Sequence, residues 1–369
     1  MYLIVGAGLT GAVIAEHIAS KLHKKVKIIE SRDHVAGNIY DFKDDNGVMV
    51  HKYGPHAFHT NNKKVWDYLS DFTKWHFYSH RVKVVIEGVE ATLPFNLDTI
   101  EELFPKKMAA SFIDKLINYY ELGAKVPVLE LVKNPDKDLR FLGQYVYDNV
   151  YAGYTAKQWG VGPEDLDGSV TARVPVYISR DNRYFQDVYQ GIPINGYTKM
   201  VEAMLDNSNI DIFLNTDFDG VTDGYEKVIF TGMIDQYFGY RYGKLPYRSL
   251  DFDFRNIDHE YFQSHSQINY PNNYDFTRIT EFKHFLNQKT DKSTIAVEYP
   301  CSYKEGLNEA YYPIPSAENH NLYKKYFELA KAEKNVVFAG RLARYEYVNM
   351  DEIVESAIKI FDEEISSNK

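Results

Sequence analysis

Hydrophobic and polar positions divide the chain into a strand-and-helix pattern at both ends and a different pattern between them. Tyr2–Val5 is a short apolar run typical of a strand, and residues 11–20 carry small and apolar side chains at helical spacing. A second apolar run ends at Glu30, and residues 334–365 repeat the order of strand, glycine turn and helix. This order predicts Rossmann-like elements at both ends of the chain.

The middle of the chain has other periodicities. Residues 97–151 carry apolar side chains at three-to-four spacing, with Asn and Asp residues as candidate caps, so they predict a helical insert. Residues 81–94 predict a hairpin around Gly88, and polar alternation in 252–302 predicts antiparallel strands. Residues 51–62 are polar and interrupted by Gly and Pro, which predicts a loop.

Three glycines follow the first predicted strand with the spacing G-x-G-x-x-G. Gly6 suits a tight turn, Gly8 lets the backbone approach a pyrophosphate, and Gly11 lets the helix pack closely on the strand. The phosphates would bind the unpaired N–H groups at the start of that helix. Glu30 ends the second strand, where a carboxylate accepts hydrogen bonds from ribose hydroxyls. Together these features predict a dinucleotide site.

Composition and charge exclude several function classes. The net charge of −10 excludes a general nucleic-acid binder, because there is no basic surplus to neutralise phosphates. Cys301 is the only cysteine, which excludes an intramolecular disulfide and a cysteine metal cluster. No apolar run is long enough to span a membrane, and a strand starting at residue 2 leaves no room for a signal peptide, so we expect a cytoplasmic protein.

Tyrosine is unusually frequent, with 31 residues. A phenol ring offers a flat apolar face and a hydroxyl, which suits the recognition of sugars and bases. Low-GC codon usage combined with ordinary half-buried packing is the alternative explanation.

Two further segments favour FAD over NAD. After Glu30, the residues Arg32, Gly37 and Asn38 resemble the signature of glutathione-reductase-like flavoproteins, with Ala36 in place of the usual first glycine. NVVFAGRLARY (335–345) resembles the second FAD contact of the same superfamily, a strand that ends in glycine at the flavin edge. A plain NAD-binding domain has no need of such a segment at the far end of the chain.

Further blocks together resemble the bacterial UDP-galactopyranose mutase family, from residue 2 to about residue 355. Several of them are specific to that family rather than to flavoproteins at large. The blocks are GPHAFHT (54–60), YAGYTAKQWG (151–160), ARVPVYISRDNRYF (172–185), GIPINGYTKM (191–200), TRITEFKHF (277–285), EYP (298–300), EAYYPIP (309–315) and GRLARYEYVNMD (340–351).

The pattern and the resemblance together predict an α/β protein with three parts. The first is a discontinuous Rossmann-like FAD-binding domain, formed by residues 1–80, 196–235 and 330–369. The second is a helical domain for substrate binding and dimerisation, residues 95–172. The third is an antiparallel β-sheet domain, residues 81–94, 173–195 and 236–329.

The resemblance implies an isomerase that interconverts UDP-galactopyranose and UDP-galactofuranose without net redox change. In the family the flavin is reduced, and its N5 attacks the anomeric carbon and displaces UDP, which is covalent catalysis by a cofactor. UDP returns after the sugar has closed through its other hydroxyl. The resemblance also implies a homodimer and a place in the synthesis of a cell-surface polysaccharide.

The resemblance assigns most of the substrate site to arginines and aromatic side chains. Arg173 and Arg278 match the two catalytic pyrophosphate arginines, whose forked guanidinium groups suit a diphosphate better than lysine does. Tyr154 and Trp159 match the uridine-binding helix and mobile loop, and Arg248 matches a further arginine near the phosphates. The tyrosines expected to hydrogen-bond the diphosphate are Tyr184, Tyr311 and Tyr347.

At the flavin, the resemblance implies contacts from both ends of the chain. His56 and His59 belong to the loop that faces the isoalloxazine, and His59 is expected to be catalytic, near N5 and the sugar. Two histidines three residues apart could also bind a metal ion, but the sequence offers no pattern that supplies a third ligand, so we expect no metal. The remaining expected contacts are Gly340, Arg341, Asn349 and Met350, and Asn349 is also expected at the substrate.

Two departures bear on the substrate. Asn349 stands where many relatives carry Asp, and His80 where many carry Asn near the sugar, so UDP-N-acetylgalactosamine stays open as an additional substrate. Two other functions stay open as well: an oxidoreductase of the amine-oxidase type on the same scaffold, and a silent nucleotide-sugar-binding protein. Fold alone does not separate the three.

Overall fold

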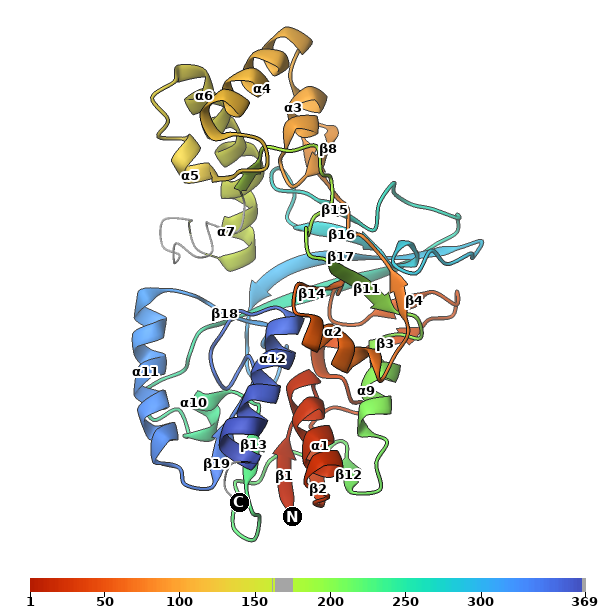
Figure 1. The fold of residues 1–369 in the computed structure, drawn as a ribbon, viewed down its shortest axis with the longest axis vertical. Coiled ribbons are helices and arrows are strands. Elements are labelled where there is room, and N and C mark those ends of the chain that lie inside the picture. The colour runs from red at the N-terminus through yellow and green to blue at the C-terminus, as the bar shows by residue number, and fades with distance from the viewer. Residues whose placement is uncertain (161, 163–174, 367–369) are drawn as a thin grey trace.

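The computed structural model describes residues 1–160, 162 and 175–366. Figure 1 shows three tiers along the long axis: a sheet flanked by helices at the end that holds both termini, a second sheet across the middle, and a group of helices at the far end. The α/β class predicted from the sequence is confirmed. The borders of the three domains stay a prediction.

A five-stranded parallel sheet joins segments from far apart in the sequence. Its strands are in the order β12-β2-β1-β13-β19, and each neighbouring pair in it is parallel. Leu3 is opposite Val228, which in turn is opposite Val336, so both ends of the chain meet in one sheet. The strand bounds are β1 Tyr2–Val5, β2 Val26–Ile29, β12 Ile210–Phe213, β13 Val228–Phe230 and β19 Val336–Phe338.

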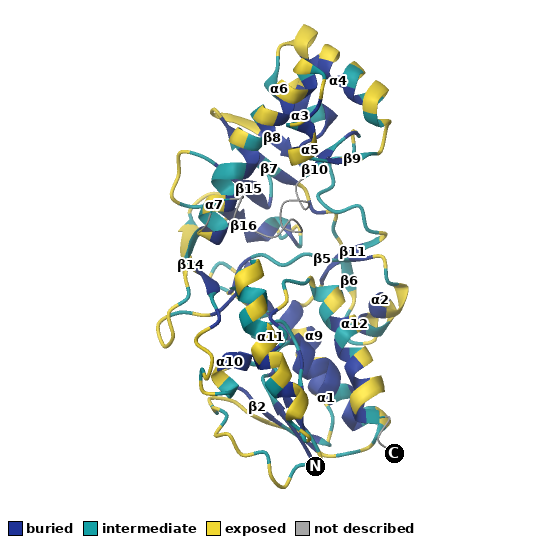
Figure 2. Cartoon of the chain, turned by 90° about the vertical axis from the view of Figure 1, so that its left-hand side faces the viewer, coloured by how far each residue is buried: buried dark blue, intermediate teal, exposed yellow. Residues whose placement is uncertain are grey.

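Helices from three parts of the chain pack together against this sheet. They are α1 (Leu9–Lys21), α9 (Tyr197–Leu205) and α12 (Met350–Ile360), and they share one apolar core with β1 and β2. Asp41 accepts hydrogen bonds from the backbone N–H groups of Tyr197 and Thr198, at 2.6 and 2.8 Å, and so caps α9. Figure 2 shows α1 and α9 as largely buried elements. On another side of this tier lie α10 (Ile234–Tyr237) and α11 (Ala317–Ala332).

The middle tier is a seven-stranded sheet in the order β18-β14-β17-β16-β15-β7-β8. The expected antiparallel pairing holds except between β15 and β7, which run parallel, because they are not joined as a hairpin. The predicted hairpin around Gly88 is confirmed as β7 and β8. The bounds are β7 Val82–Ile86, β8 Val89–Leu93, β14 Tyr247–Ile257, β15 Gln267–Asn269, β16 Arg278–Glu281, β17 Ser293–Ser302 and β18 Tyr312–Pro313.

A small antiparallel sheet links the two larger ones, in the order β5-β11-β6. Its strands are β5 (Phe58–Thr60), β11 (Tyr189–Pro193) and β6 (Trp75–Phe77). The prediction that residues 51–62 form only a loop was wrong at Phe58–Thr60, because β11 supplies backbone partners from far along the chain. Another two-stranded sheet pairs β3 (Asp41–Lys43) with β4 (Met49–His51).

The helical tier agrees with the predicted insert. Asn96 caps α3 and Asp136 caps α6 through their side-chain oxygens. The bounds are α3 Leu97–Leu103, α4 Lys106–Tyr120, α5 Val128–Leu131, α6 Lys137–Val146, the π-helical turn Tyr147–Ala152 and α7 Gly153–Trp159, with β9 (Lys125–Pro127) paired to β10 (Pro175–Tyr177).

Shorter elements complete the chain. They are α2 Lys63–Ser70, the 3₁₀ turns Gly37–Ile39 and Phe282–His284, and the π-helical turn Phe361–Ser366. Among the helices of the described residues, none combines the length and the apolar character needed to cross a bilayer.

Candidate active site

The turn after β1 is a backbone cradle that side chains would fill. Gly6 has φ of +104°, and a Cβ there would lie 2.2 Å from Thr231 Oγ1. A Cβ on Gly11 would lie 2.1 Å from the carbonyl oxygen of Gly6. At Gly8, by contrast, a Cβ would meet only the Cα of Gly37, at 3.8 Å. Gly6 and Gly11 are therefore required by the fold, whereas the free side of Gly8 is open to a ligand.

Glu30 and Arg32 lie beside this turn. Glu30 accepts a hydrogen bond from the backbone N–H of Ala7 at 2.8 Å, which ties the end of β2 to the glycine turn. Arg32 donates to Asn38 Oδ1 at 3.0 Å and to Glu309 at 2.6 Å, and it stacks on the ring of Tyr53. The predicted acidic and basic residues are thus gathered at one side of the turn.

The C-terminal segment reaches the same region. Gly340 has φ of +86°, and a Cβ there would lie 3.0 Å from Thr10 Oγ1 on α1. Arg341 donates to the backbone carbonyls of Tyr311 and Val348, at 3.3 and 3.1 Å. Its Nε is buried and has no hydrogen-bond partner within the described residues. Buried donors are rarely left unpaired, so this N–H fits an anionic or carbonyl group of a bound cofactor.

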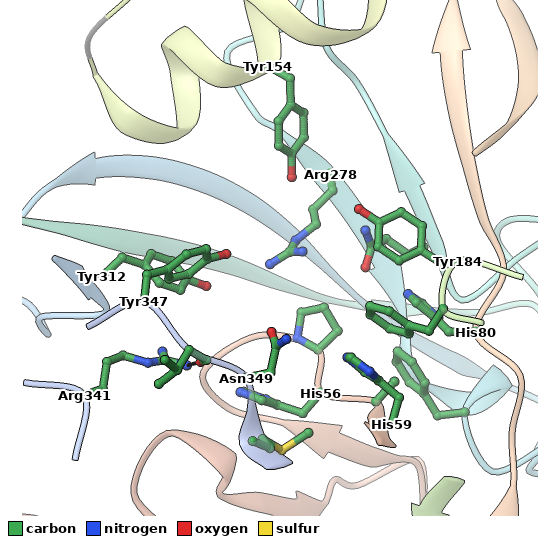
Figure 3. A pocket seen from close by; sticks show the side chains of 17 residues that line it. His56, His59, His80, Tyr154, Tyr184, Arg278, Tyr312, Arg341, Tyr347 and Asn349 are labelled. Atoms are coloured by element: carbon green, nitrogen blue, oxygen red, sulfur yellow. Dashed lines mark hydrogen bonds between the residues drawn. The ribbon is translucent and has the colours of Figure 1, made fainter. Parts of the chain in front are cut away.

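A cavity of about 940 Å³, counting its opening to solvent, lies between the lower and middle tiers. In Figure 3, Tyr154 and Arg278 enter it from above, His56 and Asn349 from below, Tyr312, Tyr347 and Arg341 from one side, and Tyr184, His80 and His59 from the other. The cavity-lining residues are Pro55, His56, Ala57, His59, His80, Tyr154, Tyr184, Phe185, Gln267, Arg278, Phe285, Tyr312, Arg341, Tyr347, Val348, Asn349 and Met350.

The cation at the centre of the cavity is held by a buried carboxylate. Arg278 Nε and Nη2 both lie 2.7 Å from Oε2 of Glu298, which is 1% exposed. Glu298 also accepts a hydrogen bond from Thr277 Oγ1 at 3.1 Å. Burial lowers the pKa of Arg278, but the ion pair with Glu298 outweighs burial and raises its pKa overall. Arg278 therefore stays charged, with its remaining N–H groups available to an anion.

The histidines at the cavity are held neutral by burial. Burial lowers the pKa of His56 to about 3, and burial together with Arg278 lowers the pKa of His80 to about 3. His51, behind them, accepts a hydrogen bond from the backbone N–H of His56 at 3.0 Å, and burial lowers its pKa to about 3. His59 lies 2.9 Å from the carboxylate of Asp187.

Tyrosines form much of the cavity wall as neutral hydrogen-bonding groups. Burial raises the pKa of Tyr154 and Tyr184, and burial with the neighbouring Tyr347 raises the pKa of Tyr312 to about 12. Tyr312 rather than Tyr311 lines the cavity. Consecutive residues of an extended segment point to opposite faces, so Tyr311, just before β18, packs instead with Tyr53 and Phe252.

Helix α7 is clamped at its C-terminal half by two cations. Lys157 donates to the carbonyls of Tyr270, Phe276 and Tyr274, at 2.5, 2.9 and 3.1 Å. Arg248 donates to the carbonyls of Gln158 and Lys157, at 3.0 and 3.1 Å, and is 7% exposed. In this structure Arg248 therefore caps a helix instead of lining the cavity. The clamp orients Tyr154, which reaches the cavity from the same helix.

The structure gathers nine of the predicted site residues in one cavity. Those at the cavity are His56, His59, Tyr154, Tyr184, Arg278, Arg341, Tyr347, Asn349 and Met350. Trp159 packs edge-on against Tyr347 just outside the cavity, with ring centroids 5.3 Å apart. Arg173 lies outside the described residues.

Sequence reasoning missed several residues of the site. Glu298, Tyr312, Phe185 and Phe285 lie within the blocks EYP, EAYYPIP, RDNRYF and TRITEFKHF, so the blocks located them but gave them no role. Gln267 lies in none of these blocks, and no sequence pattern around it indicates a place at the cavity. As to metals, no group of three or more candidate ligands occurs in the described part of the chain.

Comparisons with known proteins agree with one family over nearly the whole length. A family model described as UDP-galactopyranose mutase matches residues 149–347, and one described as an NAD(P)-binding Rossmann-like domain matches residues 4–72. The chain is 39% identical to a probable UDP-galactopyranose mutase of Klebsiella pneumoniae, over 99% of this chain and 94% of the relative. It is 34% identical to a dTDP-fucopyranose mutase of Escherichia coli, over 100% and 99%.

A solved structure shares the fold. The crystal structure of a reduced UDP-galactopyranose mutase superposes with a TM-score of 0.75 at 16% identity, over 99% of this chain and 94% of that one. At this identity the match shows the fold alone.

Proposed function

The chain belongs to the UDP-galactopyranose mutase family and is an isomerase of that family, and we propose that it works through reduced FAD and the cavity described above. The substrates are UDP-galactopyranose and UDP-galactofuranose. The observation that carries the proposal is the ion pair of Arg278, whose side chain is 18% exposed, with the buried Glu298 at the centre of a cavity bordered by the nucleotide fold. A forked cation that is held on one side and free on the other fits the diphosphate of UDP.

The residues present fit FAD. The open side of Gly8 gives the pyrophosphate access to the N–H groups at the start of α1, and Glu30 is at hand for the ribose. At the other end, the unpaired Nε of Arg341 and the N-terminus of α12, which begins at Met350, fit the negative charge of a reduced flavin. When bound, reduced FAD supplies a nucleophilic nitrogen to the anomeric carbon.

The chain's own groups then hold the displaced UDP in place. Arg278 binds the diphosphate inside the cavity through its free N–H groups. Tyr312 and Tyr347 donate phenolic hydrogen bonds to the phosphate oxygens and add no buried charge. Arg173, which lies outside the described residues, is expected to supply the second cation. Because UDP must leave and return within one turnover, these contacts favour its recapture over its loss to solvent.

Uracil binding is assigned to α7. Tyr154 extends from this helix above Arg278, on the side of the cavity opposite His56 and Asn349, and its ring is assigned to the nucleoside end of the substrate. Lys157 fixes the helix to the carbonyl of Tyr270, and Arg248 on β14 fixes it by donating to the helix's own carbonyls at Lys157 and Gln158. Trp159 continues the same surface beyond the cavity wall.

Aromatic rings exclude water from the sugar end. His59 stacks on Phe185 with ring centroids 3.6 Å apart, and His80 stacks on Phe285 at 5.9 Å. The neutral imidazole of His80 and the amide of Gln267 are the polar groups on this side. The match to a dTDP-fucopyranose mutase favours tests with other nucleotides and sugars, including UDP-N-acetylgalactosamine, beside the galactose substrate.

One experiment separates this proposal from the two other functions. Purified protein, expected to be yellow, is incubated with UDP-galactofuranose in oxidised and dithionite-reduced form, and the products are separated by chromatography. We expect UDP-galactopyranose only in the reduced sample, with no oxidised sugar. Equal conversion by the oxidised form contradicts the reduced-flavin mechanism. Sugar oxidation in step with turnover identifies an oxidoreductase, and binding without conversion in either state identifies a silent binding protein.

A further inference from the structure

The imidazole of His59 is fixed from two directions. Strand β5 carries it opposite Gln190 of β11, and its ring lies flat on Phe185, with an interplanar angle of 15° and ring centroids 3.6 Å apart. Its Nδ1 lies 2.9 Å from Oδ2 of Asp187. The stacking fixes the plane of the ring, and the carboxylate fixes its rotation within that plane.

The carboxylate is itself held in place. Asn61 donates from Nδ2 to Asp187 Oδ1 at 2.6 Å, and Gln190 donates from Nε2 to the Asp187 carbonyl at 2.8 Å. The backbone N–H of Val188 donates to Asn61 Oδ1 at 2.9 Å, which closes the arrangement. The Asp187 side chain is 23% exposed, so the pair with His59 is partly shielded from water.

The two nitrogens of the ring have different surroundings. A carboxylate only accepts hydrogen bonds, so in the neutral ring Nδ1 carries the proton and Nε2 a lone pair. Asp187 does not line the cavity, whereas His59 does, and Nε2 has no hydrogen-bond partner within the described residues. We propose that Asp187 is a positioning residue that sets this tautomer and so presents Nε2 of His59 to the cavity as a proton acceptor.

The isomerisation, on which this proposal rests, needs such an acceptor. Ring opening breaks the bond from the anomeric carbon to the 5-oxygen, which gains a proton. Closure as the furanose forms a bond from the anomeric carbon to the 4-oxygen, whose hydroxyl loses a proton. With a proton on both ring nitrogens, His59 gives the Nε2 proton to the 5-oxygen as the ring opens. The lone pair left on Nε2 then takes the proton of the 4-hydroxyl as the furanose closes, so the imidazole returns to its starting state and protons balance over the turnover.

The other titratable groups around His59 do not take this role. Burial lowers the pKa of His56 and His80 to about 3, so both rings are neutral and are weak proton acceptors near neutral pH. Nδ1 of each is also engaged, with the Gly54 carbonyl and the Tyr78 hydroxyl. Tyr184 has a pKa raised by burial and is a weak proton donor. Arg278 is the cation on this side, and Glu298 is engaged with it.

The test compares Asp187→Asn with Asp181→Asn in the FAD-loaded, reduced enzyme. Asp181 is a matched control: its side chain is 24% exposed, it lies in the same segment, and it pairs with Arg183 away from the cavity. An asparagine at 187 can donate to Nδ1 and move the proton to Nε2. We expect Asp187→Asn to lower kcat on the order of 100-fold, with KM nearly unchanged and full FAD content, and Asp181→Asn to behave as wild type.

A spectroscopic measurement shows whether Asp187 sets the tautomer of His59 or only stabilises the fold around it. In protein labelled with [¹⁵N]histidine, protonated and unprotonated ring nitrogens have different shifts, and the His59 signals are identified by their loss in His59→Gln. We expect the Nδ1–H form in wild type and the Nε2–H form in Asp187→Asn. Asp187→Glu, which keeps the carboxylate, should restore the Nδ1–H form and part of kcat. An Nδ1–H form that persists in Asp187→Asn, or a kcat equal to that of Asp181→Asn, overturns the proposal.

The outcome is independent of the reduced-flavin mechanism. If wild type fails to convert UDP-galactofuranose in reduced form, the proposed function fails, yet the tautomer still reports on Asp187. If wild type converts the substrate and the tautomer does not respond to Asp187, only the present inference fails. Thermal denaturation of each variant identifies one that has not folded, and Asp187→Glu then carries the comparison.

Discussion

The lower and middle tiers meet at one cavity but build their halves of it by different means. Around β1 and α1 the site is made of backbone, with glycines where a Cβ would strike Thr231 or the carbonyl of Gly6. Across the seven-stranded sheet it is made of side chains, at their centre the cation of Arg278 held by the buried carboxylate of Glu298.

This difference predicts two kinds of sensitivity. A site made of backbone groups is lost when a substitution adds a side chain that fills it, whereas changes of nearby charge affect it little. A buried ion pair fails when either partner is removed, because the remaining charge is left without solvation. The two halves should therefore respond to different substitutions and by different amounts.

The largest effect is expected at the cation of the middle tier. Arg278→Ala should lower mutase turnover at least about 1,000-fold, because the departing diphosphate loses its forked cation. Arg278→Lys keeps the charge but not the fork and should still lose on the order of 100-fold. The rate of UDP-galactofuranose conversion by the dithionite-reduced enzyme is the measurement.

The matched control for Arg278 lies on the same sheet. Arg255 on β14 pairs with Asp253, but its side chain is 52% exposed and lies outside the cavity. Arg255→Ala should leave turnover within about two-fold, as expected for a surface pair. Equal losses in the two alanine variants would mean that the arginines act through the sheet rather than at the diphosphate.

The next largest effect is expected at the carboxylate beneath Arg278. Glu298→Gln leaves the buried guanidinium without its counter-charge, so the free energy of unfolding should fall by about 3–5 kcal/mol and turnover by about 10- to 100-fold. Urea denaturation and the mutase assay measure the two changes. Asp253→Asn, the same kind of change at an exposed pair, should alter stability by less than about 1 kcal/mol. A Glu298→Gln protein with wild-type stability and full activity would show that Arg278 does not need the Glu298 carboxylate, either for folding or for turnover.

The same contrast explains what could be predicted from the sequence. The nucleotide cradle depends on local spacing, because a strand, a turn and a helix follow one another within residues 2–21, so Gly6, Gly8 and Gly11 were located correctly in the fold. The cavity depends on strands that pair across the chain. Nothing local to Asp187 indicates that it lies beside His59, and nothing near Gln267 indicates a cavity.

The family resemblance located some of the cavity residues that local sequence patterns do not indicate, but not all of them. The blocks located Arg278, Tyr347 and His59, all of which line the cavity. The resemblance did not separate two adjacent tyrosines: Tyr312, the first residue of β18, lines the cavity, whereas Tyr311, just before it, packs on the other side with Tyr53 and Leu250. Arg248 shows another limit: a conspicuous arginine can serve a helix terminus, and only its two carbonyl contacts reveal this.

A smaller effect is expected at the glycines, and it should separate the fold from the cofactor. Gly8→Ala adds a Cβ into the open side of the turn, so the protein should fold with normal stability but bind FAD about tenfold or more weakly. Gly11→Ala forces a Cβ against the carbonyl of Gly6, so stability itself should fall. FAD titration and thermal denaturation of the apoprotein measure both. If Gly8→Ala binds FAD as wild type does, the pyrophosphate does not lie at this turn.

The smallest effect concerns the neutral histidines where the two tiers meet. Burial lowers the pKa of His51, His56 and His80 from 6.5 to about 3, so below pH 6.5 the unfolded chain binds protons that the native protein does not. Stability is therefore complete above pH 6.5 and falls as the pH decreases toward 3. His80→Asn removes one such proton, so the slope of unfolding free energy against pH between 4 and 6 should decrease by about 1.4 kcal/mol per pH unit. Urea denaturation of both proteins at several pH values gives the slopes, and equal slopes would mean that His80 is protonated in the folded cavity.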